Sequence, residues 1–270
     1  MGRNAKEYLS NVFEGARIQF NVIRALYYRE ILTRVGKSKF GIIGIYFDPL
    51  SNILVLLLIF GVRRGFGPIL GLDLVLFIGI GRIIYALFRF ICIRSINSLQ
   101  ANKALFTHKR VKPIDTIITR SIVEMLSLGV VFSLIVLGYS IIKETWFIVD
   151  LPLILFSFLC ITILSFGLGL IVMIAGFRYP IIQIIVPIII RPFYFLSGVF
   201  FSIQSVPQWL KPWLSWNPIL QAIELTRKGF SEKYFLDPVI SGTYLFIFVI
   251  FTLCLSLYIY QRNERLLIAT

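Results

Sequence analysis

Six apolar runs, each long enough to cross a bilayer, constrain the fold of this chain more than any other feature. Their approximate limits are 41–61, 69–91, 117–141, 150–176, 181–203 and 239–260, and a membrane-spanning helix needs ~20 residues to cross a hydrocarbon core of ~30 Å. Hydrophobic residues make up 58% of the chain and charged residues only 15%, which is more apolar surface than a water-soluble core of this size could hide. The sequence therefore predicts an all-α integral membrane protein with six transmembrane helices.

The distribution of lysine and arginine predicts the topology. The formal net charge is +14, which in a soluble protein would suggest nucleic-acid binding but in a membrane protein is typical of cytoplasmic loops that face anionic lipid. If both termini are cytoplasmic, the inside segments carry more than twice as many Lys and Arg residues as the outside segments. We therefore expect both termini to be cytoplasmic, and we expect no nucleic-acid partner.

The N-terminal segment 15–33 is predicted to form an amphipathic helix. Ile18, Val22 and Leu26 fall on one helical face, and Arg17 with Arg24 on another. A solvated basic extension is the alternative, but the segment continues directly into the first apolar run, which favours a helix lying in the membrane interface. We therefore divide the chain into a cytoplasmic N-terminus with this interface helix, 1–38, and one transmembrane domain, 39–270.

The stretch TRVGKSKFG, residues 33–41, contains the GKS triplet that ends a phosphate-binding P-loop. A P-loop also needs a glycine five residues before the second glycine, because the chain must turn tightly for several backbone N–H groups to converge on phosphate. That position is Ile31, and no buried strand precedes it. The match is accidental, and we expect no cofactor or catalytic site on this chain.

The loop 96–117 carries a basic cluster and apolar residues together. Lys109, Arg110 and Lys112 precede Pro113, which would end a helix, and Asp115 could cap a new one. An ordinary positive-inside loop would explain the charges, but Leu99, Leu105 and Phe106 are needlessly apolar for a solvated connector. Exposed apolar residues with a polar rim indicate a docking surface for a cytoplasmic partner protein.

Several charged residues fall within the predicted spans. Arg120 and Glu124 are four residues apart and can neutralise each other. Arg82, Arg89 and Arg191 are costly against lipid, so each is expected to face protein, a water-filled path or a headgroup. Snorkelling accounts for Arg89 as well as a path does, whereas Arg82 and Arg191 favour a polar path for an anionic or hydroxylated cargo.

The segment 206–230 is too polar and too interrupted by proline to span the bilayer, yet it is rich in tryptophan. Trp209, Trp213 and Trp216 recur at spacings that can place them on one face of a short helix. Asn217 and Pro218 are typical of the N-cap and first residue of a second short helix. The pair is predicted to be re-entrant, with the tryptophans either anchored at the interface or stacked on sugar rings.

Three runs resemble a known family. ALYYREILTRVGKSKFGIIGIYFDPL, QANKALFTHKRVKPIDTIITR and the RPFYFLSGVFF to VPQWLKPWLSWNPILQAIELTRKGF region are similar to the inner-membrane permease of bacterial capsular polysaccharide ABC exporters. The resemblance implies a multi-pass inner-membrane permease that pairs with a second copy of itself and recruits two ATP-binding subunits, which carry the ATP and Mg²⁺. It also implies a lipid-linked glycan substrate, with periplasmic and outer-membrane export proteins as further candidate partners.

The resemblance also implies roles for particular residues. The ATPase-coupling element would include Asn102, Leu105, Phe106, Lys109, Arg110, Lys112, Pro113 and Asp115. The translocation path, which the charges within the spans indicate rather than the resemblance, is expected to include Arg82, Arg191, Phe193 and Tyr194. The re-entrant periplasmic helices, placed before the last span, would include Trp209, Trp213, Trp216, Asn217 and Pro218. The chain departs from the family in having Ile45 and Asp48-Pro49 where a Trp and a Glu-Pro pair are common, and in having Arg82 and Arg89 where uncharged residues are expected.

Other functions compete with this interpretation. A permease for O-antigen or teichoic-acid glycans is the nearest alternative. An ion-coupled secondary transporter would need carboxylates near the midplane, and Glu124 is the deep candidate. A membrane-embedded transferase would need a nucleophile or metal constellation, but the sole histidine, His108, lies in a basic loop with no evident catalytic partner.

Overall fold

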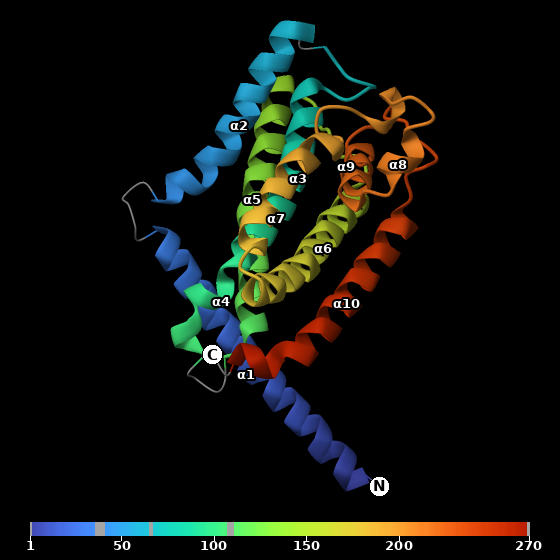
Figure 1. Ribbon diagram of the computed structural model, residues 1–270. Helices are drawn as coiled ribbons and strands as arrows, with labels where there is room; N and C mark the ends of the chain where they lie inside the picture. Colours follow the sequence, from blue (N-terminus) through green and yellow to red (C-terminus); the bar gives the residue numbers. More distant parts are fainter. Residues whose placement is uncertain (1, 36–40, 65–66, 107–110, 269–270) are drawn as a thin grey trace.

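The protein is built from helices (Figure 1). The computed structural model describes residues 2–35, 41–64, 67–106 and 111–268. Within these ranges the α-helices are α1 (Gly2–Val35), α2 (Gly41–Arg64), α3 (Leu74–Ile96), α4 (Ser98–Ala101), α5 (Pro113–Lys143), α6 (Leu151–Arg178), α7 (Ile182–Leu196), α8 (Lys211–Ser215), α9 (Pro218–Lys228) and α10 (Gly242–Ile268), with short 3-10 helices η1 (Lys103–Leu105) and η2 (Ile203–Ser205). The same ranges contain no strand, only an isolated bridge between Ile69 and Leu72. The prediction of an all-α protein is confirmed.

Four helices, α3, α5, α6 and α10, are long and apolar enough to cross a bilayer. The fifth predicted span is shorter than expected, because α7 ends at Leu196 and contains Pro187 and Pro192. Its 15 residues extend only ~22 Å at ~1.5 Å per residue, against a hydrocarbon core of ~30 Å. Helix α2 extends over Gly41–Arg64 and contains the apolar stretch Leu50–Ile59. The integral membrane class is supported, whereas the count of six spans stays a prediction.

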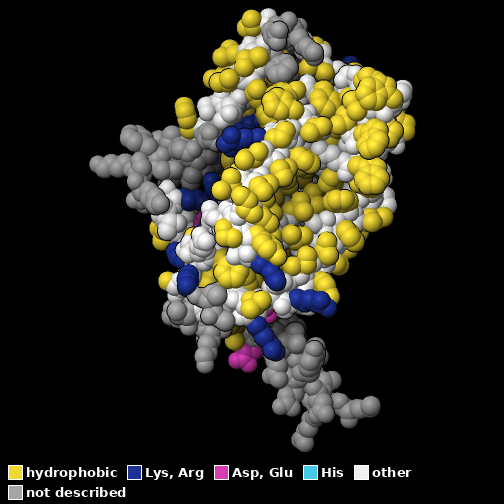
Figure 2. Space-filling model, in the orientation of Figure 1, with side chains coloured by type: hydrophobic (Ala, Val, Ile, Leu, Met, Phe, Trp, Pro, Cys, Tyr) yellow, Lys and Arg dark blue, Asp and Glu magenta, His cyan; other side chains and the backbone are white. Residues whose placement is uncertain are grey.

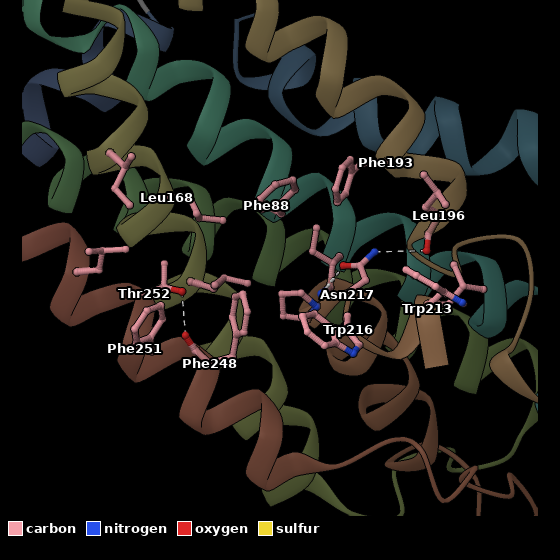
Figure 3. A pocket seen from close by; sticks show the side chains of 16 residues that line it. Phe88, Leu168, Phe193, Leu196, Trp213, Trp216, Asn217, Phe248, Phe251 and Thr252 are labelled. Carbon is pink, nitrogen blue, oxygen red and sulfur yellow. Dashed lines mark hydrogen bonds between the residues drawn. The ribbon is translucent and has the colours of Figure 1, made fainter. Parts of the chain in front are cut away.

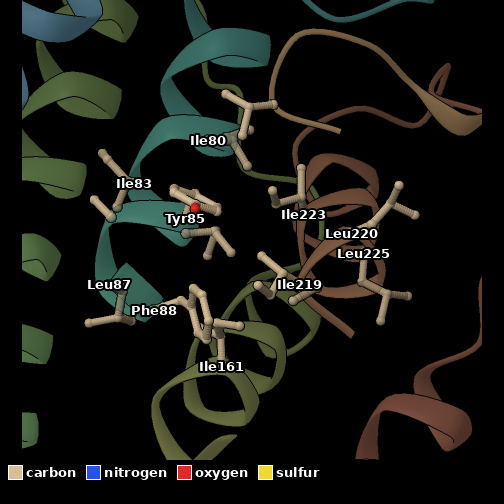
Figure 4. Close-up of a cluster of buried hydrophobic side chains, with 14 of the residues drawn as sticks. Ile80, Ile83, Tyr85, Leu87, Phe88, Ile161, Ile219, Leu220, Ile223 and Leu225 are labelled. Carbon is tan, nitrogen blue, oxygen red and sulfur yellow. The ribbon is translucent and has the colours of Figure 1, made fainter. Parts of the chain in front are cut away.

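Helix α3 forms the centre of the bundle. In its most apolar window 83% of the residues are buried, against 22% in α10, because α3 packs against α2, α5, α6, α7 and α9 while α10 packs mainly on α6. Figure 4 shows side chains of α3, such as Ile80 and Tyr85, directed toward Ile219 and Ile223 of α9. The surface of α10 is rich in exposed apolar residues, as expected of a helix that faces lipid.

Helix α1 packs along the first part of α5 (Figure 1). Leu26, on the predicted apolar face, is buried, but Ile18 on that face is exposed. A second apolar side of the helix carries Phe20, Tyr28 and Leu32, which are also exposed. The sequence predicts one apolar face, whereas the helix has two apolar sides. The side with Leu26 packs on protein, and the side with Phe20, Tyr28 and Leu32 is exposed and available to a membrane interface.

Residues 197–241 fold into a compact unit between α7 and α10, which we call the helical cap. It contains η2, α8 and α9 and lies at the end of the bundle opposite the start of α1 and the end of α10 (Figure 1). Figure 2 shows hydrophobic side chains covering much of the visible face, with a hollow among them. Two short helices are found where the tryptophan-rich segment predicted them.

Candidate functional site

An arginine and two tyrosines meet inside the bundle, and we call Arg82, Tyr85 and Tyr194 the Arg82 cluster. The side chain of Arg82, near the middle of α3, is only 4% exposed, and its guanidinium lies 5.8 Å from the centroid of the Tyr194 ring on α7. The rings of Tyr85 and Tyr194 are 4.9 Å apart, and the Tyr85 hydroxyl donates a hydrogen bond to the carbonyl oxygen of Ile190. The Arg82 cluster therefore places a guanidinium over the Tyr194 ring in the interior of a largely apolar bundle.

The other two predicted path residues, Arg191 and Phe193, lie outside the Arg82 cluster. Arg191 is exposed on α7, and Phe193 is 41% exposed. Both follow Ile190, whose carbonyl the Tyr85 hydroxyl engages, so the α3 to α7 contact fixes the position of this helix turn. The structure therefore joins Arg82 and Tyr194 directly and places Arg191 and Phe193 on the surface of the same helix.

Charged residues of α1, α3 and α5 form a network across the helices. Glu124, 3% exposed, accepts hydrogen bonds from Arg34 at 2.6 Å and from Arg94. Glu30 of α1 pairs with Arg34 at 3.2 Å and with Arg120 at 3.8 Å. The predicted neutralisation of Arg120 by Glu124 within α5 is wrong. Glu124 pairs instead with Arg34 of α1 and Arg94 of α3, and Arg120 pairs with Glu30 of α1.

The start of α5 follows the predicted local signals. Pro113 is its first residue, where a missing N–H costs no helical hydrogen bond. Asp115 caps the helix from its third position rather than from before it, because its carboxylate accepts the backbone N–H of Lys112 at 2.9 Å. It also accepts a hydrogen bond from Gln19 of α1 and is fully buried. Lys112 is exposed and pairs with Glu264 of α10 at 2.9 Å.

The predicted coupling residues preceding α5 face partly inward. Asn102 is buried, donates to the carbonyl of Ser98 at 2.7 Å and accepts a hydrogen bond from Arg29 of α1. Leu105 and Phe106 are half-buried, and Phe106 packs against an apolar cluster formed by residues of α4, α5, α6 and α10. The predicted Lys109 and Arg110, like His108, lie outside the described residues. Phe106 is thus less exposed than a docking knob predicted from sequence would be.

The helical cap is fixed by a buried ion pair that sequence reasoning did not single out. Arg227 and Glu224 are both 0% exposed and lie 3.3 Å apart on α9. The guanidinium of Arg227 sits 3.5 Å from the centroid of the Phe77 ring of α3. Burial raises the pKa of the Tyr234 phenol, which stays protonated and donates to Glu224 at 2.8 Å. The cap is therefore held to α3 by a desolvated polar network.

A sequence signal for this network existed in QAIELTRKGF, where Glu and Arg are three residues apart in a run of apolar residues. Gly81 of α3 supplies the space that the network needs. A Cβ at this position would lie 3.0 Å from Val199 Cα and 3.1 Å from Arg227 Nη2. Glycine therefore permits the close approach of α3 to the cap.

The tryptophans of the cap are exposed, at 72% for Trp209, 80% for Trp213 and 77% for Trp216. They do not share one helix, because α8 begins at Lys211 and ends at Ser215, so only Trp213 lies within it. The N-cap prediction is confirmed: the Asn217 side chain accepts the backbone N–H of Ile219 at 3.0 Å, and Pro218 is the first residue of α9.

An apolar cavity of about 580 Å³ lies beside the cap. Residues of α3, α6, α7 and α10 line it together with the segment 213–219 (Figure 3). Figure 3 shows the labelled side chains in an elongated row from Leu168 and Thr252 to Leu196 and Trp213. In the described part of the chain, no group of three or more His, Cys, Asp and Glu residues could hold a metal ion.

Comparison with known proteins identifies the family of this chain. Residues 21–231 match the family described as ABC-2 type transporter. The polysialic acid transport protein KpsM of Escherichia coli is 33% identical over 257 residues, which cover 95% of this chain and 98% of KpsM. The capsule polysaccharide export inner-membrane protein CtrC of Neisseria meningitidis is 28% identical over 82% of this chain and 83% of its own, and BexB of Haemophilus influenzae is 27% identical over 89% of each chain. The chain belongs to the ABC-2 type transporter family.

Proposed function

We propose that this protein is the membrane-spanning subunit of an ATP-driven exporter that moves lipid-linked capsular polysaccharide across the bacterial inner membrane. The observation that carries the proposal is the similarity to KpsM over 95% of the chain and 98% of the relative, because a match of that extent includes the whole permease rather than one shared segment. ATP hydrolysis then belongs to separate ATP-binding subunits. A permease for O-antigen or teichoic-acid glycans remains the alternative for cargo.

The Arg82 cluster supports a path for an acidic glycan. A buried guanidinium within a membrane-spanning helix is costly and is usually kept for a substrate path or a partner. In the proposal, Arg82 and Tyr194 line the inner part of the path, and Arg191 and Phe193 meet cargo where α7 is exposed. The indoles of Trp209, Trp213 and Trp216 stack on sugar at the exit.

The loop 98–106 is proposed to receive the force from the ATP-binding subunits. Arg29 of α1 holds Asn102 of this loop, and Phe106 joins it to the apolar cluster that contains residues of α5, α6 and α10. A push on the loop would therefore reach α1 and three long helices together. The proposed contact is made by Lys103, which is exposed, and by the accessible parts of Leu105 and Phe106.

The proposal also specifies topology and assembly. The bundle crosses the membrane six times with both termini in the cytoplasm, and α8 with α9 forms a re-entrant pair on the outer side. Two copies form the pore. The position of the start of α1 and the end of α10 at the same end of the bundle is in keeping with an even number of crossings (Figure 1).

Reconstitution tests the proposal. The permease is purified with its co-expressed ATP-binding partner and inserted into vesicles that contain purified glycolipid, and the glycan that crosses the bilayer is measured with ATP or with a non-hydrolysable analogue. Transport should require hydrolysis and should persist when proton and sodium gradients are collapsed. Transport that ceases with the gradients but ignores ATP would instead identify a secondary transporter.

A further inference from the structure

The cavity beside the helical cap has the chemistry of a hydrocarbon site. Its lining consists of leucine, isoleucine, phenylalanine, tryptophan and proline side chains, with Asn217 and Thr252 as the polar exceptions. The volume of about 580 Å³ falls within the range of ~300–1,000 Å³ that small-molecule sites occupy. The ligand class is therefore decided by what the two polar side chains can still offer.

Both polar side chains already have partners within the protein. Asn217 accepts from the backbone N–H of Ile219 and donates to Ser197 Oγ at 3.1 Å and to the carbonyl of Leu196 at 3.3 Å. The hydroxyl of Thr252 donates to the carbonyl of Phe248 at 2.8 Å. A polar ligand in the interior of this space would lose hydrogen bonds to water and meet side chains that are already engaged within the protein, so the interior favours an apolar ligand.

The surroundings of the cavity indicate which apolar ligand it suits. Its lining includes residues of α3, α6 and α10, three of the helices that are long and apolar enough to span a bilayer. Its lining side chains form an elongated row that ends at Leu196 and Trp213 (Figure 3). Trp213 and Trp216 are largely exposed at this end, and tryptophan side chains favour the level of lipid headgroups.

From this arrangement we infer that the cavity is a binding site for a fatty acyl chain of a lipid, with the chain between α6 and α10 and the headgroup beside Trp213 and Trp216. The site goes beyond the proposed export function, since it holds an acyl chain from either a bulk phospholipid or a lipid-linked substrate. The elongated shape suits one extended chain.

A photoreactive phospholipid with a diazirine near the end of one acyl chain tests the site in the purified full-length protein in nanodiscs. Crosslinked peptides from the lining parts of α6 and α10 should dominate over those from other lipid-facing segments. Leu255→Trp places bulk in the cavity and should abolish this preference, whereas Ile250→Trp, on the same helix, should leave it intact. Leu255 and Ile250 are both 41% exposed, and only Leu255 lines the cavity.

Two further measurements keep the result interpretable. Each variant should elute at the same volume as the wild-type protein and keep its thermal midpoint. If Leu255→Trp does not, Leu168→Trp fills the cavity from α6 instead.

Mass spectrometry identifies the source of the lipid, by comparing lipid released from protein made with and without the glycolipid pathway. Retention in both preparations indicates a bulk lipid, and retention only with the pathway indicates the substrate anchor. Equal crosslinking of all lipid-facing segments, or unchanged labelling in the filled variants, would overturn the inference, as would disulfide trapping of two copies through Leu255→Cys without lipid labelling.

Discussion

Replacing Arg227 with methionine should detach the helical cap from the bundle. The guanidinium of this fully buried residue donates to the carbonyls of Phe77, Val199 and Phe201 at 3.1–3.2 Å and pairs with Glu224 at 3.3 Å. Methionine keeps much of the volume but removes every donor. The variant leaves a carboxylate in a site from which water is excluded.

The magnitude follows from burial on both sides of the pair. Because Arg227 and Glu224 are each 0% exposed, solvent screening does not reduce the effect, and removing one partner of a buried pair typically costs ~3–5 kcal/mol. Arg227→Lys should cost less than methionine but more than an exposed substitution, since one ammonium cannot reach all three carbonyls and the Glu224 carboxylate. Glu224→Gln combined with Arg227→Met should recover part of the loss, because no unpaired charge remains.

Thermal unfolding in detergent, followed by tryptophan fluorescence and by far-ultraviolet circular dichroism, measures this effect. Three of the four tryptophans lie in the cap, so fluorescence reports mainly on the cap and dichroism on the whole bundle. In Arg227→Met the fluorescence transition should move to a lower temperature and precede the loss of helix. An unchanged fluorescence midpoint, or a double variant no more stable than Arg227→Met, would refute the assignment of the buried pair as the attachment of the cap.

Three further predictions concern transport and coupling. Arg82→Gln and Arg191→Gln should each reduce export if both face a path for acidic cargo, and cysteines at these positions should react with a water-soluble thiol reagent; protection in every nucleotide state would contradict the path. Phe106→Ala should abolish substrate-stimulated ATPase activity in assembled complexes, since truncating an apolar anchor typically costs ~2 kcal/mol or more of binding free energy. Lys112→Ala should retain most of the stimulation, and the reverse ranking would indicate an electrostatic docking surface. Glu124→Gln should loosen α1 by ~1–3 kcal/mol because the partly buried guanidinium of Arg34 loses its counter-charge. Limited proteolysis of α1 would detect this change, and an unchanged cleavage rate would count against the network.

Local signals in the sequence were sufficient for several elements. Pro113 with Asp115 marked the start of α5, and Asn217 with Pro218 marked the start of α9, because capping depends on residues within one turn of the helix. The long apolar runs identified the membrane class for a similar reason. Apolar length is a property of a contiguous segment and needs no knowledge of its neighbours.

Tertiary structure decided the partners of the buried polar groups and the shape of the cavity. Glu124 pairs with Arg34, 90 residues away, and Arg227 reaches the carbonyl of Phe77 across 150 residues, so neither partner could be read from helical spacing. The cavity likewise combines residues from six separate helices with the turn that joins α8 to α9. Sequence alone determined the membrane class and the starts of α5 and α9, because those properties are local. Which charges meet, how far Phe106 is buried and where space remains for a lipid chain depend on packing between segments distant in the chain.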